Sequence, residues 1–210
     1  MNIRSRMLHG LYAVTDSGAA PATPLAEAVA AAIRGGAHLV QYRDKCGDAA
    51  RRLREAQALL AVCREHEVPL LINDDVDLAV EIGADGVHLG REDAPLDEAR
   101  VRTGPRAILG VSCYDSLERA LAAEQAGADY VAFGSFFASP SKPQAVRAPL
   151  ELLSIARQRL NVPCCAIGGI TPENGAALVA AGADMLAVIR GLFAQADIEA
   201  TARKYARLFQ

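Results

Sequence analysis

An alternation of two kinds of segment along the whole chain constrains the fold most strongly. Apolar runs of strand length recur at residues 11–16, 38–44, 69–74, 85–90, 107–113, 129–136, 163–169 and 185–191. Longer Ala- and Leu-rich segments with a helical period lie between them, for example at residues 24–37, 49–67 and 116–128, and an amphipathic segment at 197–209 closes the chain. Strands that are apolar on both faces are typical of a parallel sheet covered by helices.

We therefore expect an α/β fold in which eight strand–helix units close into a (β/α)8 TIM barrel. No linker or low-complexity segment divides the chain, so residues 1–210 are expected to form a single domain. An open doubly wound sheet is the alternative, but the first strand–helix turn lacks the GxGxxG pattern of that fold. Gly-Ala-Asp at 83–85, 127–129 and 182–184 is typical of a helix end followed by a short turn into a strand.

Composition excludes several classes of function. The formal net charge of -3 and the dispersed basic residues argue against nucleic acid as a partner. No apolar run approaches the roughly 20 residues that a membrane span needs, and the N-terminus has no apolar signal core. The 5 cysteines form no CxxC pair, so neither a disulfide framework nor a zinc site is expected. These features favour a reducing cytoplasm, and the sequence leaves the oligomeric state open.

Polar side chains gather at the carboxyl ends of the expected strands, where this fold carries its active site. They are Gln41, Arg43 and Lys45 after the second strand, Asn73 and Asp74 after the third, His88 and Asp93 after the fourth, Ser112 after the fifth, Ser139, Ser141 and Lys142 after the sixth, and Arg190 after the eighth. Gln41 and Arg43 share strand parity, so both can face the barrel mouth. Asp75 and Asp77, by contrast, are expected to cap a helix or to lie in its first turn.

Asp74 and Asp93 are the candidate metal ligands. Each follows its own strand, and neighbouring strands lie about 4.8 Å apart, so the two carboxylates can converge on one cation. Oxygen ligation with few protein ligands suits Mg²⁺, which shares its remaining positions with water and substrate phosphates. Arg43, Lys45 and Lys142 would then meet the phosphates rather than the aspartates.

The stretch AIGGITPEN, residues 166–174, predicts a second anion site. Gly168 and Gly169 let backbone N–H groups approach a ligand closely, and Thr171-Pro172 is a typical helix start. The exposed N–H groups of a helix N-terminus attract phosphate. Two anion sites indicate transfer chemistry with a diphosphate leaving group, whereas a single-phosphate isomerase would need only the second site.

Six motifs, in this order, resemble the thiamine phosphate synthase family: QYRDK, INDDVDLA, GADGVHLGRED, LGVSC, FGSFFASPSKP and AIGGIT. The resemblance covers nearly the whole chain, from Tyr12 to about Phe193. It implies a cytoplasmic barrel transferase that joins 4-amino-2-methyl-5-hydroxymethylpyrimidine diphosphate to 4-methyl-5-hydroxyethylthiazole phosphate, giving thiamine phosphate and pyrophosphate. The pyrimidine CH2–O bond would ionise first, and the thiazole nitrogen would capture the resulting cation, so no protein nucleophile is needed.

The resemblance also implies a role for each site residue. Asp74 and Asp93 would hold Mg²⁺, and Arg43, Lys45, Asn73, Ser112 and Lys142 would hold the diphosphate. Gln41, Tyr12 and His88 would line the pyrimidine pocket, although a core role suits His88 equally well. Ser139, Ser141 and Gly169 would bind the thiazole phosphate, with serines where the family often has threonines. Ile189 is a further substrate contact, and Arg190, where many members have serine, either binds the thiazole phosphate or projects outwards.

Three other functions remain open at this stage. A thiazole tautomerase of the same barrel family would need neither the aspartate pair nor the QYRDK cluster. A non-catalytic binder of thiamine precursors would not need a complete set of metal ligands. A sugar-phosphate isomerase or epimerase would leave the aspartate pair without a role.

Overall fold

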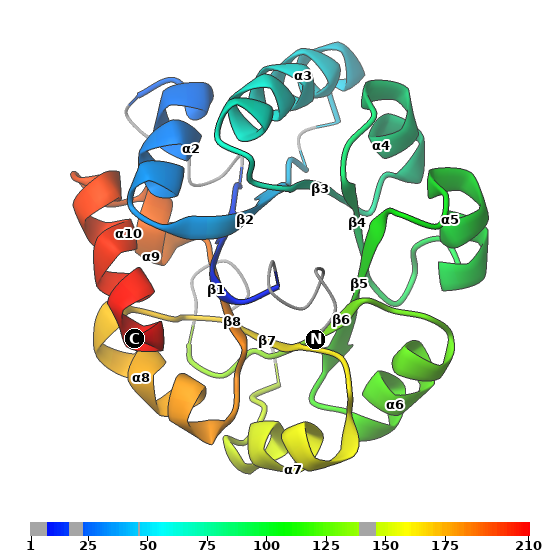
Figure 1. The fold of residues 1–210 in the computed structure, drawn as a ribbon, viewed down its shortest axis with the longest axis vertical. Coiled ribbons are helices and arrows are strands. Elements are labelled where there is room, and N and C mark those ends of the chain that lie inside the picture. Colours follow the sequence, from blue (N-terminus) through cyan, green and yellow to red (C-terminus); the bar gives the residue numbers. More distant parts are fainter. Residues whose placement is uncertain (1–7, 17–22, 46, 139–145) are drawn as a thin grey trace.

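The structure is a computed structural model that describes residues 8–16, 23–45, 47–138 and 146–210. Eight parallel strands form a closed barrel surrounded by helices (Figure 1). The strands are β1 (Gly10–Val14), β2 (Ala37–Tyr42), β3 (Leu70–Asn73), β4 (Gly86–Leu89), β5 (Ile108–Tyr114), β6 (Tyr130–Phe133), β7 (Cys164–Ile167) and β8 (Met185–Val188). Because β1 pairs with both β2 and β8, the sheet closes on itself and the predicted TIM barrel is confirmed over a doubly wound sheet.

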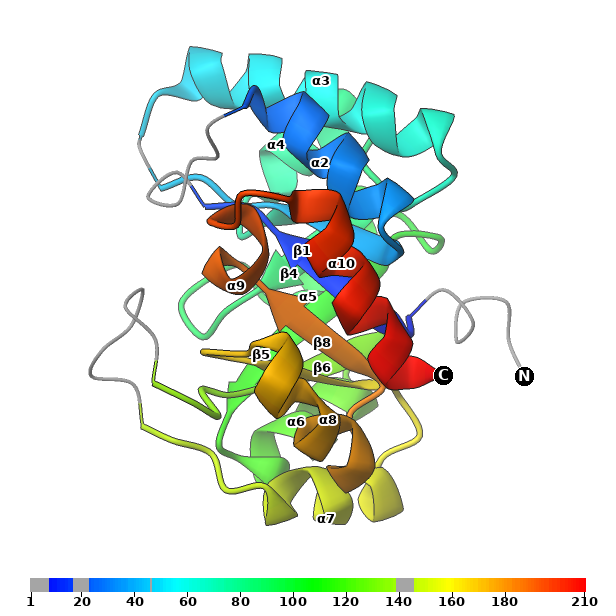
Figure 2. The same ribbon diagram turned by 90° about the vertical axis from the view of Figure 1, so that its left-hand side faces the viewer.

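Helices follow the strands around the outside of the barrel. They are α2 (Leu25–Arg34), α3 (Ala49–Glu65), α4 (Val76–Ile82), α5 (Leu96–Thr103), α6 (Leu117–Gln125), α7 (Glu151–Arg159), α8 (Pro172–Ala181), α9 (Arg190–Phe193) and α10 (Ile198–Ala206), followed by the short 3-10 helix η2 (Arg207–Phe209). In Figure 2, α9 lies at the face where β8 ends, and the C-terminal end of α10 lies at the opposite end of the barrel. The predicted strand and helix segments agree with these bounds, apart from a few residues at their ends.

The apolar side chains divide into two layers because the side chains of a strand alternate between its two faces. A smaller cluster fills the interior of the barrel and includes Tyr12, Leu71, Tyr130 and Met185. A larger cluster, with Val40, Ile72 and Val131 among its strand residues, packs between the barrel and the helices. The interior layer forms the floor beneath the carboxyl ends of the strands.

The Gly-Ala-Asp sequences have a structural role that the sequence did not reveal. Each aspartate precedes a strand and bonds to the first or second residue of the strand before it. The Asp184 carboxylate accepts the Cys164 N–H at 2.8 Å, and the Asp184 N–H donates to the Cys164 carbonyl at 2.8 Å. Asp85 and Leu70 form the same pair of bonds, as do Asp129 and Leu109. These aspartates tie neighbouring strands together at the amino end of the barrel, away from the strand ends that carry the candidate site.

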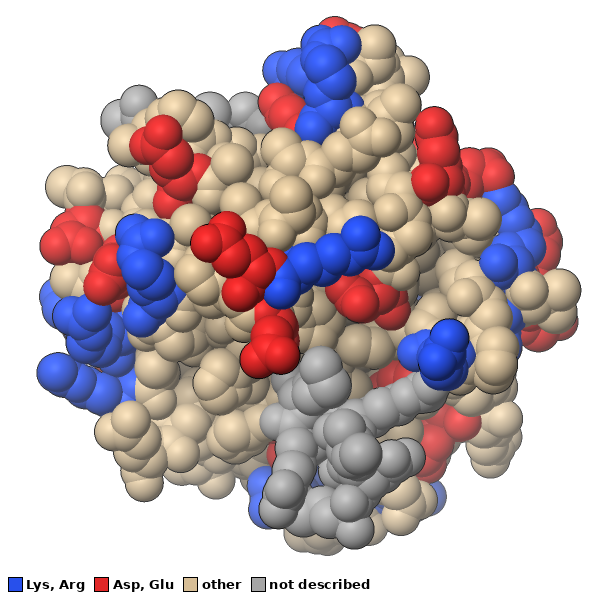
Figure 3. All heavy atoms as spheres, turned by 45° about the horizontal axis from the view of Figure 1, so that its top comes forward, with Lys and Arg blue, Asp and Glu red and all other residues tan. Residues whose placement is uncertain are grey.

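The structure confirms the predictions for Asp75, for Asp77 and for the cysteine pair in the seventh strand. Asp75 is the N-cap of α4 and accepts the Leu78 N–H at 2.9 Å, while Asp77 lies in the first turn. Cys164 and Cys165 are buried in β7, and the 4 described cysteines are free. Among the described residues, no helix is long and apolar enough to cross a bilayer. On the face shown in Figure 3, acidic and basic side chains are interspersed rather than gathered by sign.

The aspartate pairing predicts a stability effect without a catalytic one. Asp184→Ala should lower the free energy of unfolding by about 1–3 kcal/mol, because the Cys164 N–H loses its acceptor. Chemical denaturation would measure the change, with Asp97→Ala at an exposed position of α5 as the control. Equal unfolding free energies for the two variants would contradict this role.

Candidate functional site

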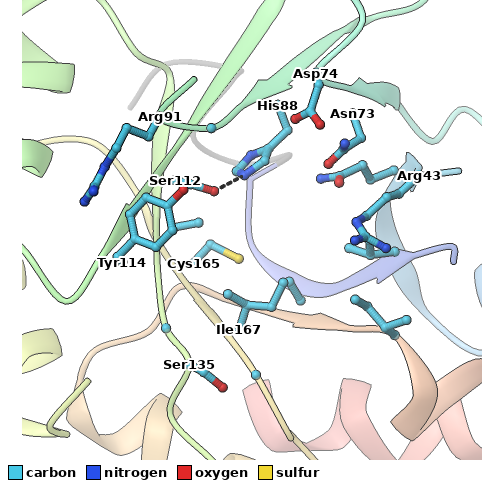
Figure 4. Close-up of a pocket in the computed structure, with 18 of the residues that line it drawn as sticks. Arg43, Asn73, Asp74, His88, Arg91, Ser112, Tyr114, Ser135, Cys165 and Ile167 are labelled. Atoms are coloured by element: carbon cyan, nitrogen blue, oxygen red, sulfur yellow. Dashed lines mark hydrogen bonds between the residues drawn. The ribbon is translucent and has the colours of Figure 1, made fainter. Parts of the chain in front are cut away.

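A cavity of about 670 Å³ opens at the carboxyl ends of the strands, and Figure 4 shows its lining. Most of the predicted site residues in the described part of the chain line it. They are Tyr12, Gln41, Arg43, Lys45, Asn73, Asp74, His88, Asp93, Ser112 and Ile189. The structure therefore brings together side chains from strands far apart in the sequence, as the barrel requires.

Five predicted residues are not among these lining residues: three lie outside the described part of the chain, and two are described but do not line the cavity. Ser139, Ser141 and Lys142 lie outside the residues that the structure describes. Arg190 is exposed at the start of α9, and neither it nor Gly169 is among the described residues that line the cavity. Their immediate neighbours Ile189 and Gly168 do line it.

Asp74 lies just beyond the end of β3 in an unusual backbone conformation. Its φ of 63° is in the left-handed region, which aspartate tolerates better than most residues. Its N–H donates to the His88 carbonyl of β4 at 2.8 Å, which fixes the turn. Its carboxylate accepts a hydrogen bond from Lys45 Nζ at 2.5 Å. A residue held in this strained region at a pocket rim is typical of a functional site.

Asp93 reaches the same place from the loop after β4. Its carboxylate accepts the Gly90 N–H at 2.6 Å, and a side chain at position 90 would press on it, because a Cβ there would lie 2.9 Å from Asp93 Oδ2. Burial and a hydrogen bond with Asp74 raise the pKa of Asp93 above its usual value. Burial also disfavours ionised Asp74, but hydrogen bonds from Lys45 and Asp93 outweigh it and lower the pKa of Asp74. The two carboxyl groups thus lie close enough for each to shift the pKa of the other.

This geometry fits a divalent cation held by two carboxylates. A cation between Asp74 and Asp93 would relieve the repulsion between the two carboxylates, which otherwise raises the pKa of Asp93. Among the described residues there is no cluster of three or more His, Cys, Asp or Glu side chains able to hold a metal. Few protein ligands, all of them oxygen, suit Mg²⁺, which keeps positions for water and phosphate.

Arg43 and Lys45 do not stand apart from carboxylates, contrary to the expectation from the sequence. Lys45 bonds to Asp74, and Arg43 forms an ion pair with Asp16, just after β1. The attraction between opposite charges a few ångströms apart accounts for both contacts. Thr15 holds the backbone of Arg43, because its hydroxyl accepts the backbone N–H of Arg43 at 2.9 Å. Thr15 and Asp16 therefore fix the position of Arg43.

The loop between β7 and α8 forms a second polar region. Gly168 and Gly169 have φ values of 108° and 63°. A side chain at either position would collide with the chain after β6, since a Cβ at Gly168 would lie 2.1 Å from Ser135 Oγ. Thr171 caps α8, and its N–H donates to Asn174 Oδ1 at 2.8 Å. Ser135 lies on the opposite side of the pocket from Asp74 and Asn73 (Figure 4), so the site has two polar ends.

Several functional residues were not identified from the sequence. Ser135, Arg91 and Tyr114 line the cavity, and Arg91 lies over the Tyr114 ring at 5.1 Å. Ser135 lies in the same motif, FGSFFASPSKP, as the predicted residues Ser139 and Ser141, and its place two residues after the end of β6 is the signal that could have identified it. Asp16 could have been found as the acid that directly follows the first strand. Nothing in the sequence marks Arg91 as a pocket residue rather than a solvated charge.

Comparisons with known proteins show the family of the chain. The family model described as thiamine monophosphate synthase matches residues 11–192. The chain is 53% identical over 203 residues to the thiamine-phosphate synthase of Thioalkalivibrio sulfidiphilus, covering 97% of this chain and 96% of that protein. It is 52% identical over 205 residues to the thiamine-phosphate synthase of Nitrosococcus oceani, covering 98% and 94%.

A solved structure gives the same result for the fold. The thiamine phosphate pyrophosphorylase from Pyrococcus furiosus superposes with a TM-score of 0.87 at 33% sequence identity, covering 99% of this chain and 97% of that one. 3-Hexulose-6-phosphate synthase, with 18% identity and a TM-score of 0.68, shares the fold alone. The family match over most of the chain, with relatives above half identity along nearly its full length, establishes that this chain belongs to the thiamine monophosphate synthase family.

Proposed function

We propose that the chain is an Mg²⁺-dependent thiamine phosphate synthase that condenses the pyrimidine diphosphate with the thiazole phosphate. One observation carries the proposal: a single cavity joins the Asp74–Asp93 pair to Arg43 and Lys45 at one end. Its other end is formed by Ser135 and Gly168, beside the glycine-rich loop before α8. A diphosphate and a monophosphate can thus be bound at opposite ends of one pocket.

The first end suits the diphosphate. Asp74 and Asp93 would hold Mg²⁺, which when bound would draw off the negative charge that develops on the leaving pyrophosphate. Arg43, positioned by Asp16, and Lys45 would donate to its oxygens as preorganised charges. Lys45 would move from Asp74 to the phosphates, a short shift for a side chain that is 56% exposed. Asn73 and Ser112 line the same cavity as further polar contacts.

The centre of the pocket suits a reaction without a protein nucleophile. Cys165 is the lining residue with a thiol, and burial raises its pKa far above the usual value, so it stays neutral. Gln41 and His88 are only 4% and 9% exposed and present polar groups on an otherwise apolar floor. Such a floor can hold an aminopyrimidine ring in place while its CH2–O bond ionises. Positioning of the two substrates would then contribute much of the rate.

The second end suits the thiazole phosphate. The positive φ values of Gly168 and Gly169 and the start of α8 create a backbone environment that favours an anion. Ser139, Ser141 and Lys142 are proposed to complete the two phosphate sites from the loop after β6. Arg190 remains a proposed phosphate ligand. Its side chain is exposed and would have to turn toward the pocket to bind the phosphate.

The tautomerase alternative is less well supported. A thiazole isomerisation gives no role to two neighbouring carboxyl groups beside Lys45. It also leaves Arg43, Asp16 and Thr15, a connected set at the ends of β1 and β2, without a substrate group to bind. A non-catalytic binder would likewise not need a metal beside a diphosphate.

We further infer that residues 1–210 act as one catalytic domain in a reducing cytoplasm. The closed barrel and the 4 free, buried cysteines in the described residues support this setting. Its partners would be two small-molecule substrates. No nucleic acid or membrane partner is proposed, and the oligomeric state is left open.

Metal dependence gives the first test of the function. Mass spectrometry of the protein with both substrates should detect thiamine phosphate with Mg²⁺ and not with a chelator. Asp74→Asn and Asp93→Asn should each lower kcat/KM by about a hundredfold or more, because charge on the leaving group is no longer neutralised. Asp77→Asn, an exposed acid of α4 outside the pocket, is the matched control. Full activity in chelator, or in either site variant, would overturn the metal assignment.

A second test concerns the support of Arg43. Asp16→Asn keeps the shape of the side chain but removes the charge paired with Arg43. We expect the KM for the pyrimidine diphosphate to rise about three- to tenfold, with little change in the KM for the thiazole phosphate. Glu199→Gln, which removes a charge paired with Arg203 on α10, should change neither constant. Equal changes in both KM values would argue against a role confined to the diphosphate end.

A further inference from the structure

A continuous chain of hydrogen bonds crosses the floor of the pocket. It runs through five side chains from five strands, in the order Gln41, Tyr12, Tyr130, His88 and Ser112. The distances between successive partner atoms are 2.5, 2.9, 2.8 and 2.9 Å. Gln41 and Ser112, the two ends of the chain, line the cavity, whereas Tyr130 lies beneath the lining and is fully buried.

A glycine on β5, Gly110, allows the Tyr130 side chain to reach His88. His88 of β4 pairs in register with Gly110 of β5, and Gly110 pairs with Tyr130 of β6. The Tyr130 ring crosses over Gly110, because a Cβ at that position would lie 2.1 Å from Tyr130 Cζ. The ring stacks on His88 with centroids 5.6 Å apart and meets Tyr12 edge-on at 5.9 Å. Only glycine at position 110 leaves room for this connection.

The orientation of the Gln41 amide gives the chain of hydrogen bonds one direction, because the amide nitrogen faces Tyr12. Gln41 Nε2 can only donate, so the Tyr12 oxygen accepts and the Tyr12 hydrogen turns to Tyr130. The Tyr130 hydrogen then turns to His88 Nδ1. A His88 ring that accepts at Nδ1 carries its hydrogen on Nε2 and donates to Ser112 Oγ. The Ser112 hydrogen is thereby left for the cavity.

If every hydrogen bond in the chain ran the other way, Gln41 would present a donor and Ser112 would present only lone pairs to the cavity. This reversal would turn the Gln41 oxygen toward Tyr12 and the amide nitrogen toward the cavity, and it would make Ser112 donate to His88. A serine whose hydrogen is used in this way meets a diphosphate oxygen only with its lone pairs. Both phenols keep their hydrogens in either direction, since burial raises the pKa of Tyr12 and of Tyr130 above the usual value.

We propose that Tyr130 is a positioning residue that orders this chain in one direction, so that Gln41 presents an acceptor and Ser112 a donor to the substrate. The acceptor would take an N–H of the amino group on the pyrimidine, and the donor would bond to a diphosphate oxygen. This assignment rests on the proposed function, since it names the ligand groups that the two ends of the chain would meet. Tyr130 itself touches neither substrate.

The tautomer of His88 tests the direction in the unmodified protein. In protein labelled with ¹⁵N-histidine, the nitrogen shifts and couplings distinguish a ring protonated at Nε2 from one protonated at Nδ1. The signals of His88 among the 4 histidines are assigned by their loss in His88→Asn. We expect the Nε2–H tautomer at neutral pH. A ring protonated at Nδ1, or at both nitrogens, would overturn the proposal.

Tyr130→Phe tests the part that Tyr130 plays. Without the hydroxyl, Nδ1 loses its donor, so the Nδ1–H tautomer of His88 should become populated and kcat/KM should fall about ten- to a hundredfold. Tyr42→Phe is the matched control, because its hydroxyl is also buried but donates to Glu55 on α3, outside the barrel. It should leave the His88 signals and kcat/KM near wild type.

The outcomes separate this proposal from the function on which it rests. An unchanged tautomer in Tyr130→Phe, or a changed tautomer with unchanged kcat/KM, would overturn the positioning role. If Tyr130→Phe does not fold, the tautomer of the wild-type protein still tests the direction of the chain. Absence of thiamine phosphate with wild-type protein would instead overturn the proposed function, whatever the state of His88.

Discussion

The pairing of β1 with β8 is the contact on which the rest of the structure depends. It closes eight parallel strands into a ring, with Leu11 beside Leu186 and Tyr12 beside Ala187. Closure removes the free edges of the sheet and brings the carboxyl ends of all the strands to one rim. The Gly-Ala-Asp carboxylates tie neighbouring strands at the other end of the barrel. The bonds that stabilise the barrel and the residues of the candidate site therefore lie at opposite ends of the strands.

Charge balance shapes the rim that this closure creates. Two partly buried carboxyl groups lie together there and shift each other's pKa, and Lys45 compensates the charge of Asp74. Opposite charges at short range stabilise each other, and Arg43 and Lys45 each have an acidic partner within the protein. Binding of a metal and a diphosphate would exchange these partners rather than expose new charges. The site is therefore preorganised for a ligand that carries both kinds of charge.

Much of the fold could be predicted from the sequence, because alternating apolar strands and amphipathic helices follow from local periodicity. The candidate site could be predicted for residues at or just after the end of a strand, such as Asn73 and Asp74, since their place at the rim depends only on strand order. Contacts that depend on register could not. His88 and Tyr130 are 42 residues apart, and their contact requires Gly110 on the strand between them.

The pairing of Arg43 with Asp16 and of Lys45 with Asp74 was likewise not predictable. Composition shows which charges are present but not which of them meet, and here the sequence alone favoured phosphate as the partner of both cations. The motifs also gave no reason to separate Ile189, which lines the cavity, from Arg190, which is exposed at the start of α9. Whether a residue after a strand faces the cavity or the solvent depends on the direction in which the backbone leaves the strand end.

The most direct test of the central claim is a crystal structure of the protein with Mg²⁺ and pyrophosphate. The account predicts one metal ion bound by the carboxylates of Asp74 and Asp93 at about 2.0–2.1 Å, with pyrophosphate on Arg43 and Lys45. Lys45 should then have left Asp74. Pyrophosphate bound elsewhere, or a metal that does not touch both aspartates, would contradict the account.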